Sequence, residues 1–86
     1  MARMKVAVRK KHIKAGLPSE KHSCPIALAL KAKGCTGVVV DSEALSFTDS
    51  KGDAYALVMP TDARHFTEAF DRGEFVTPFT FVVPLD

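Results

Sequence analysis

Apolar and polar residues alternate at the start of the chain. Met4, Val6 and Val8 fall on one face of an extended segment, while Lys5 and Arg9 fall on the other. A period of two is typical of a strand with one buried face. We therefore predict a strand over residues 4–9 whose exposed face is basic.

The spacing of apolar residues becomes helical at two places. Ser23 is a candidate helix cap, Pro25 suits a first turn because its missing N–H costs little there, and Gly34 ends the helix. A second helix begins at Thr61, from which apolar residues recur at helical spacing. The polar residues 12–22, before the first helix, are expected to form an ordered loop.

The remaining apolar runs are short and rich in β-branched or aromatic residues. They predict strands over residues 37–41, 44–48, 54–59 and 79–83. The turn-rich segment 49–53 joins the middle two as a β-hairpin. The element order β-α-β-β-β-α-β predicts an α/β (α+β) fold, a small two-layer sandwich. We expect one mixed sheet of about five strands, with two helices stacked on one side.

Size and strand pattern together suggest self-association. The chain has 86 residues, which predicts one domain over 1–86 with a core that is only just sufficient. Residues 54–59 and 79–83 carry apolar side chains on both faces, and two helices cover only one face of a sheet. We therefore expect a homodimer; the alternative is that loop 12–22 folds over the uncovered face.

No apolar run approaches the roughly 18 residues of a membrane span, and the N-terminus lacks the continuous apolar stretch of a signal peptide. We expect no membrane partner and a cytoplasmic location.

Charge is divided along the chain. Residues 1–33 carry nine Lys and Arg against one Glu, a net charge of +8, whereas residues 34–86 carry three against nine Asp and Glu, a net charge of −6. The two parts either pair with each other or offer a basic surface to an anionic partner. The candidate interaction or anion-binding residues are Lys5, Arg9, Lys10, Lys11 and Lys14. Nucleic acid is a possible partner but not the favoured one, because no helix-turn-helix, aromatic-basic strand or paired-cysteine module accompanies them.

The segment from His12 to Leu30 carries a pattern. His12-Ile13-Lys14-Ala15-Gly16 is followed by Cys24-Pro25-Ile26-Ala27-Leu28-Ala29-Leu30. This resembles small proteins of actinobacterial bacteriophages in which an H-I-x-x-G segment precedes a C-P-[IV]-A-x-A helix start. The resemblance covers about the first third of the chain. It implies a viral accessory protein made in the cytoplasm of a bacterial host, and it supplies no catalytic residue.

Three residues of that pattern region are candidate site residues: His12, His22 and Cys24. A thiol at a helix N-terminus faces unpaired N–H groups, which lower its pKa and make it a candidate nucleophile. The structural alternative is that Cys24 fills a small apolar gap. We predict no metal site and no cofactor, because paired Cys or His spacings are absent. We also expect no disulfide, because Cys24 and Cys35 are separated by a helix of about 15 Å.

The sequence favours a non-catalytic interaction protein over an enzyme. Its partner would be a host protein, bound through an apolar or charged surface. The alternatives are a basic nucleic-acid-binding module and a thiol-dependent enzyme or ligand-binding domain centred on Cys24.

Overall fold

The computed structural model describes residues 3–85 and contains five strands and three helices. In chain order these elements are β1 (Arg3–Val8), α1 (Lys10–Ala15), α2 (Pro25–Ala32), β2 (Thr36–Val40), β3 (Ala44–Thr48), β4 (Ala54–Val58), α3 (Thr61–Asp71) and β5 (Phe79–Pro84). The α/β class is confirmed, and so is the order β-α-β-β-β-α-β once the short helix α1 is set aside. The hairpin of β3 and β4 is also confirmed: the two strands pair antiparallel from Ala44↔Val58 to Thr48↔Ala54.

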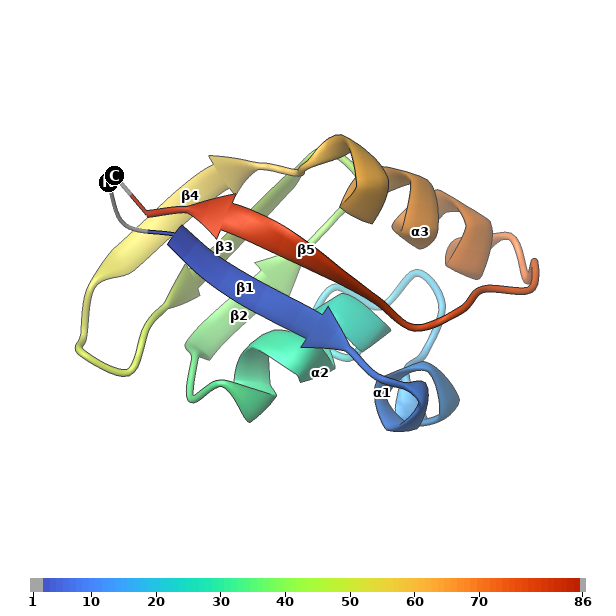
Figure 1. The fold of residues 1–86 in the computed structure, drawn as a ribbon, viewed down its shortest axis with the longest axis horizontal. Coiled ribbons are helices and arrows are strands. Elements are labelled where there is room, and N and C mark those ends of the chain that lie inside the picture. The colour runs from blue at the N-terminus through green and yellow to red at the C-terminus, as the bar shows by residue number, and fades with distance from the viewer. Residues whose placement is uncertain (1–2, 86) are drawn as a thin grey trace.

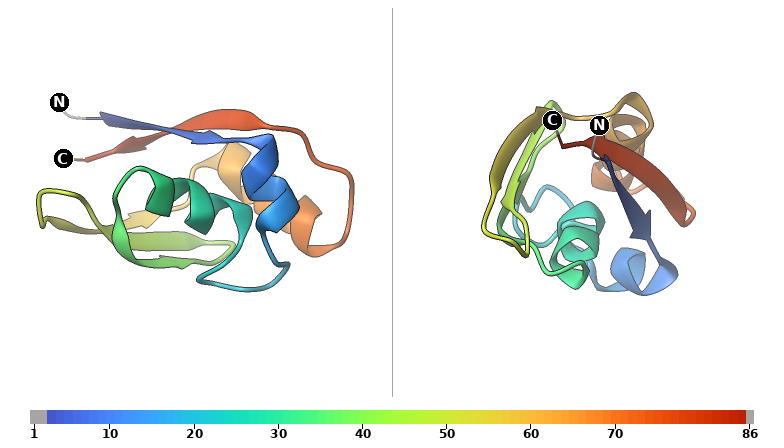
Figure 2. Two further views of the ribbon diagram at one scale, coloured as in Figure 1. Left: turned by 90° about the horizontal axis from the view of Figure 1, so that it is seen from below. Right: turned by 60° about the vertical axis from the view of Figure 1, so that its left-hand side comes forward.

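The strands form two antiparallel sheets in place of the expected single mixed sheet. One sheet has the order β2-β3-β4, and the other is a ribbon of β1 and β5. The three-stranded sheet and the ribbon lie on opposite sides of the molecule, with α2 and α3 closing the space between them (Figures 1 and 2). The helices therefore separate the sheets, which prevents all five strands from pairing in one layer.

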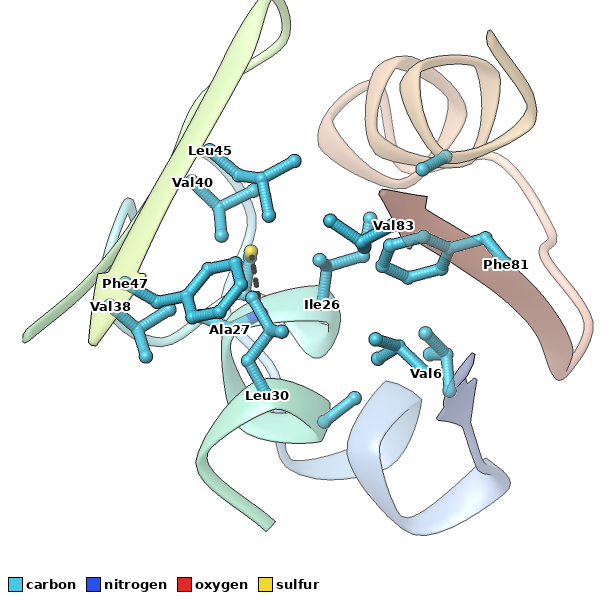
Figure 3. Packing of buried hydrophobic residues seen from close by; sticks show 14 of the residues in the cluster. Val6, Ile26, Ala27, Leu30, Val38, Val40, Leu45, Phe47, Phe81 and Val83 are labelled. Carbon is cyan, nitrogen blue, oxygen red and sulfur yellow. Dashed lines mark hydrogen bonds between the residues drawn. The ribbon is translucent and has the colours of Figure 1, made fainter. Parts of the chain in front are cut away.

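One hydrophobic cluster fills the space between the sheets and helices. Val6 from β1, Phe81 and Val83 from β5, and Leu45 and Phe47 from β3 point into it (Figure 3). Helix α2 lies across its base, with five buried residues in eight. The alternation predicted for the first strand is confirmed in β1, because Val6 and Val8 are buried and Lys5 is exposed.

Aromatic contacts connect α3 to the ribbon. The Phe66 ring on α3 lies 4.8 Å from the Phe79 ring on β5, measured between centroids, and Phe79 lies 5.6 Å from Phe81. Such pairs contribute roughly 0.5–1.5 kcal/mol beyond burial. The segment that joins α3 to β5 is therefore attached at both ends to elements that these aromatic contacts hold together.

Two local predictions need correction. The expected loop 12–22 is helical in its first part, because α1 runs to Ala15. The His12 Nδ1 atom accepts the Arg9 N–H at 2.9 Å, which stabilises the first turn of α1. The cap of α2 is Cys24 and not Ser23, since the Cys24 Sγ atom accepts the Ala27 N–H at 3.4 Å.

Candidate functional site

Among residues 3–85, no salt bridge joins the basic first third to the acidic remainder. Between residues 3 and 85 the structure contains one ion pair, Arg72–Glu74, with 2.9 Å between Nε and Oε2, and both partners belong to the acidic part. The five candidate residues Lys5, Arg9, Lys10, Lys11 and Lys14 are all exposed. Their charges are therefore free to act on a partner.

Helix α1 divides these cations between two hollows. Lys10, Ile13 and Lys14 recur at helical spacing and line a groove together with residues 73–78. Lys11 and His12 line a separate cleft beside β1. The candidate basic residues are thus two sets with different surroundings.

The first hollow, which we call the apolar groove, has a volume of about 810 Å³. One wall is α1, and the other is the segment that follows α3. Most of the lining surface is apolar, and the charged residues among the lining are Lys10, Lys14 and Glu74. Its lining residues are Lys10, Ile13, Lys14, Pro18, Phe70, Gly73, Glu74, Phe75, Val76, Thr77 and Pro78.

Phe75 is the most exposed large apolar side chain of the described residues, at 89%. The neighbouring Val76 packs against the core and holds the segment in place. Five of the six phenylalanines are buried or half-buried, so Phe75 is the exception. The Phe75 ring is not buried in the core, although the rest of this small fold is well packed. Such an exposed ring indicates an interaction surface.

The second hollow, which we call the basic cleft, has a volume of about 480 Å³. Lys5 and Arg9 come from β1 and its end, Lys11 from α1, and Lys33 from the C-cap of α2. The other lining residues are Ala7, His12, Ala29, Ala32 and Thr80. No carboxylate from residues 3–85 lines the cleft.

His12 is almost fully buried at the side of the basic cleft, with 6% of its surface exposed. Its Nδ1 atom accepts the Arg9 N–H, so the neutral ring carries its proton on Nε2. Burial, and then repulsion from Lys11 and Arg9, lowers the pKa of His12 below its ordinary value of 6.5. The lowered pKa favours the neutral imidazole at pH 7.

The pattern around Gly16 and Pro25 has a packing explanation. A Cβ atom at Gly16 would lie 2.6 Å from the Pro25 Cδ atom and 2.8 Å from the Pro25 backbone nitrogen. Glycine is therefore required where the end of α1 meets the start of α2. The Leu17 N–H also donates to the Ser23 carbonyl at 2.9 Å. In this fold the H-I-x-x-G and C-P segments form a joint between two helices.

Cys24 and His22 also have structural contacts. Burial raises the pKa of the Cys24 thiol, more than its hydrogen bonds with Ala27 and Ile26 N–H groups lower it. This direction is opposite to the activation expected from the helix N-terminus. The His22 Nδ1 atom lies 3.0 Å from the Val38 carbonyl oxygen. His12 lines the basic cleft, Cys24 lines another hollow, and His22 lines neither.

A third hollow of about 220 Å³ adjoins Cys24. It is lined by Ser19, Glu20, Lys21, Cys24, Val40, Asp41, Ser42, Thr67 and Asp71. The hydroxyl of Thr67 is buried there without a hydrogen-bond partner. No histidine lines this cavity, so it offers the thiol no base of the kind that cysteine enzymes use.

Within the described chain, no three His, Cys, Asp or Glu side chains gather in a way that could hold a metal ion. Both cysteines are free, as expected from their separation. No helix in residues 3–85 has the length and apolar character that a membrane span requires.

Sequence reasoning missed two contributors to these hollows. Lys33 joins Lys5 and Arg9 only because α2 packs beside β1. Phe75 and Val76 come after the glycine that ends α3 and before Pro78, outside any helical or strand period. Two adjacent large apolar residues in such a loop are a usable signal for an exposed apolar site.

Comparisons with known proteins identify no relative: no family model, no curated protein and no solved structure matches the chain. The resemblance to bacteriophage proteins therefore stays a prediction.

Proposed function

We propose that this chain is a non-catalytic interaction protein that binds an acidic, apolar segment of a partner protein in its apolar groove. The observation that supports this most is Phe75, an exposed side chain that lines a mostly apolar groove. Aromatic residues, Phe among them, are enriched in the cores of protein–protein interfaces.

The charged residues of the groove select the kind of segment. Among the residues that the structure describes, Lys10 and Lys14 have no ionic partner, whereas Glu74 is already paired with Arg72. The groove therefore presents positive charge beside apolar surface. Acidic residues flanking an apolar anchor complement both features.

A second copy of this chain is a poorer occupant of the groove. A two-fold interface places the same patch on both subunits, so Lys10 and Lys14 of one copy would meet a patch of the same net positive charge on the other. Like charges in such an interface are unfavourable. The groove thus favours a different protein.

The biological setting that we propose is a bacteriophage accessory protein acting on a host protein in the bacterial cytoplasm. It is supported by the His12 to Leu30 pattern. No histidine lines the hollow beside Cys24, so the thiol-enzyme alternative gains no support from that hollow.

We also propose a homodimer, through the three-stranded sheet and away from the groove. Strand β4 is an edge of that sheet, and Val58 on it is 84% exposed. Exposed apolar edges of this kind pair with other chains. Light scattering of the purified protein tests this, with Val58→Lys as the variant that should yield a monomer.

A photo-crosslinking residue placed at position 75 tests the interaction function. The probe is incorporated in place of Phe75 and, in a matched control, in place of Val58, which is similarly exposed in the single subunit and belongs to the proposed dimer interface, so that it should attach to a second copy of the chain. After crosslinking in host extract, the attached peptide is sequenced and the partner is purified. We expect an attached segment with apolar residues flanked by Asp or Glu.

Binding of the purified partner is then measured with Phe75→Ser and Val58→Ser. Loss of an aromatic hot spot of at least about 2 kcal/mol corresponds to roughly 30-fold weaker binding. Phe75→Ser should show this loss and Val58→Ser should not, while both keep the far-ultraviolet circular dichroism of the original. Equal binding of the two variants contradicts the proposal. Crosslinking from position 75 only to a second copy of the chain also contradicts it.

A further inference from the structure

The basic cleft combines cations from three elements that are distant in the sequence. Lys5, Arg9, Lys11 and Lys33 surround about 480 Å³. None of them has an ionic partner among residues 3–85. Concentrating four like charges around one hollow has an electrostatic cost that an anion in the hollow would remove.

The local backbone offsets only a small part of this charge. Lys33 is at the C-cap of α2, where the helix carries about half a negative charge. Four formal positive charges exceed it several-fold. The cleft therefore stays strongly positive.

We propose that the basic cleft binds phosphate groups through Lys5, Arg9, Lys11 and Lys33. Apart from His12, the remaining lining side chains are small or hydroxylic, such as Ala7 and Thr80, so the cleft leaves room for an anion. This site is distinct from the apolar groove and uses different residues.

The distance between the cations of the basic cleft favours a chain of phosphates over a single phosphate. Lys5 and Arg9 are separated by four residues of extended chain, about 13 Å at roughly 3.3 Å per residue. One phosphate is much smaller than this span, whereas successive phosphates of a single-stranded nucleic acid extend along it. Because all four cations are exposed, each contact is weak, and binding should be strongly salt-dependent.

His12 reports directly on occupancy of the cleft. Its ring lines the cleft, and the positive groups that face it are Lys11 and Arg9, with Lys5 and Lys33 on the neighbouring elements. An anion between them lowers the positive potential at the ring. Phosphate binding should therefore raise the pKa of His12, and by reciprocity lower pH should strengthen binding.

The experiment measures fluorescence anisotropy of a labelled 12-nucleotide single strand, as DNA and as RNA, from 50 to 300 mM salt. Four contacts predict a slope of about −2.8 for log K against log salt, at roughly −0.7 per phosphate contact. The double variant Lys11→Gln with Lys33→Gln should reduce the slope to about −1.4. Relative to equal affinities at about 1 M salt, the smaller slope corresponds to roughly 25-fold weaker binding at 0.1 M salt.

The matched control is Lys10→Gln with Lys14→Gln. It removes the same charge from the same part of the molecule, but from the apolar groove. Binding by overall charge alone would weaken equally in the two double variants, and that result overturns the proposal. Retained affinity in the control with loss in the cleft variant supports it.

Nuclear magnetic resonance titration of His12 gives the second readout, with inorganic phosphate and triphosphate as separate probes. An upward shift of the His12 pKa with the oligonucleotide but not with the small anions assigns the site to a nucleic-acid strand. A shift with the small anions at sub-millimolar concentration assigns it to a free phosphate compound. An unchanged His12 pKa with every probe, together with equal affinities of the two double variants, rejects the site.

Discussion

The apolar groove and the basic cleft share helix α1, yet they offer opposite chemistry. The groove takes Lys10, Ile13 and Lys14 and surrounds an exposed Phe75. The cleft takes Lys11 and His12 and contains no apolar side chain larger than alanine. One six-residue helix therefore supplies two surfaces, because residues three and four apart share a face and adjacent residues do not.

The difference shows that a run of basic residues need not be one binding site. Between positions 9 and 14 the sequence reads as a single cluster of positive charge. In the fold, two of its lysines frame apolar surface, and the others join Lys5 and Lys33. The first setting suits a protein segment, and the second suits phosphate.

The substitution with the largest expected effect should weaken binding at the apolar groove and the basic cleft together. Gly16→Ala places a Cβ atom against the Pro25 ring and backbone nitrogen, so α1 must move away from α2. We expect a loss of about 1–3 kcal/mol in the free energy of unfolding, measured with urea, and weaker binding at both surfaces.

Gly52→Ala is the comparison for that change. Its Cβ atom would meet nothing within 4 Å, so only the positive φ of 94° opposes it. It should leave both binding activities intact. Normal partner and oligonucleotide binding by Gly16→Ala would show that the joint does not position α1.

The next effect separates the two surfaces. Lys10→Gln with Lys14→Gln should weaken binding of the acidic partner segment, whereas Lys11→Gln with Lys33→Gln should weaken binding of the oligonucleotide about 25-fold at 0.1 M salt. Each double variant is measured with both ligands by anisotropy. If the same double variant weakens binding of both ligands, the groove and the cleft act as one binding surface.

A smaller effect concerns pH and the cleft alone. The pKa of His12 is below 6.5 in the folded protein, so protonation favours the unfolded chain. The stabilisation from neutral His12 is complete above about pH 6.5 and is lost as pH falls through the lowered folded pKa.

Urea unfolding at pH 7.5 and at pH 5.5 checks this sign. His12→Asn keeps an acceptor for the Arg9 N–H but does not titrate. The variant should lose less stability between the two pH values than the original protein. Identical losses would mean that His12 titrates alike in both states.

The smallest effect tests the third hollow. Thr67→Val removes a buried hydroxyl that has no hydrogen-bond partner. Because leaving such a group unsatisfied is unfavourable, we expect the free energy of unfolding to rise by up to about 1 kcal/mol. Both binding activities should be unchanged, and a drop in either would connect this cavity to the surfaces.

Local patterns determined much of the fold. The alternation of Met4, Val6 and Val8 predicted β1, and the turn residues between 48 and 54 predicted the hairpin of β3 and β4. These elements follow from periodicity and turn chemistry, which operate over a few residues. The same patterns indicated that the Lys and Arg residues near the N-terminus face outward.

Tertiary structure alone decided how the elements share space. The sheet to which a strand belongs depends on which strands the helices separate. No local sequence pattern predicts that β1, near the N-terminus, pairs with β5, near the C-terminus. Likewise, Lys33 reaches the cleft through the packing of α2 beside β1, and burial raised the Cys24 pKa against the local helix field. The sequence thus determined which residues are basic, apolar or able to turn. Burial and long-range contacts determined what those residues face, because both depend on parts of the chain that are remote in sequence.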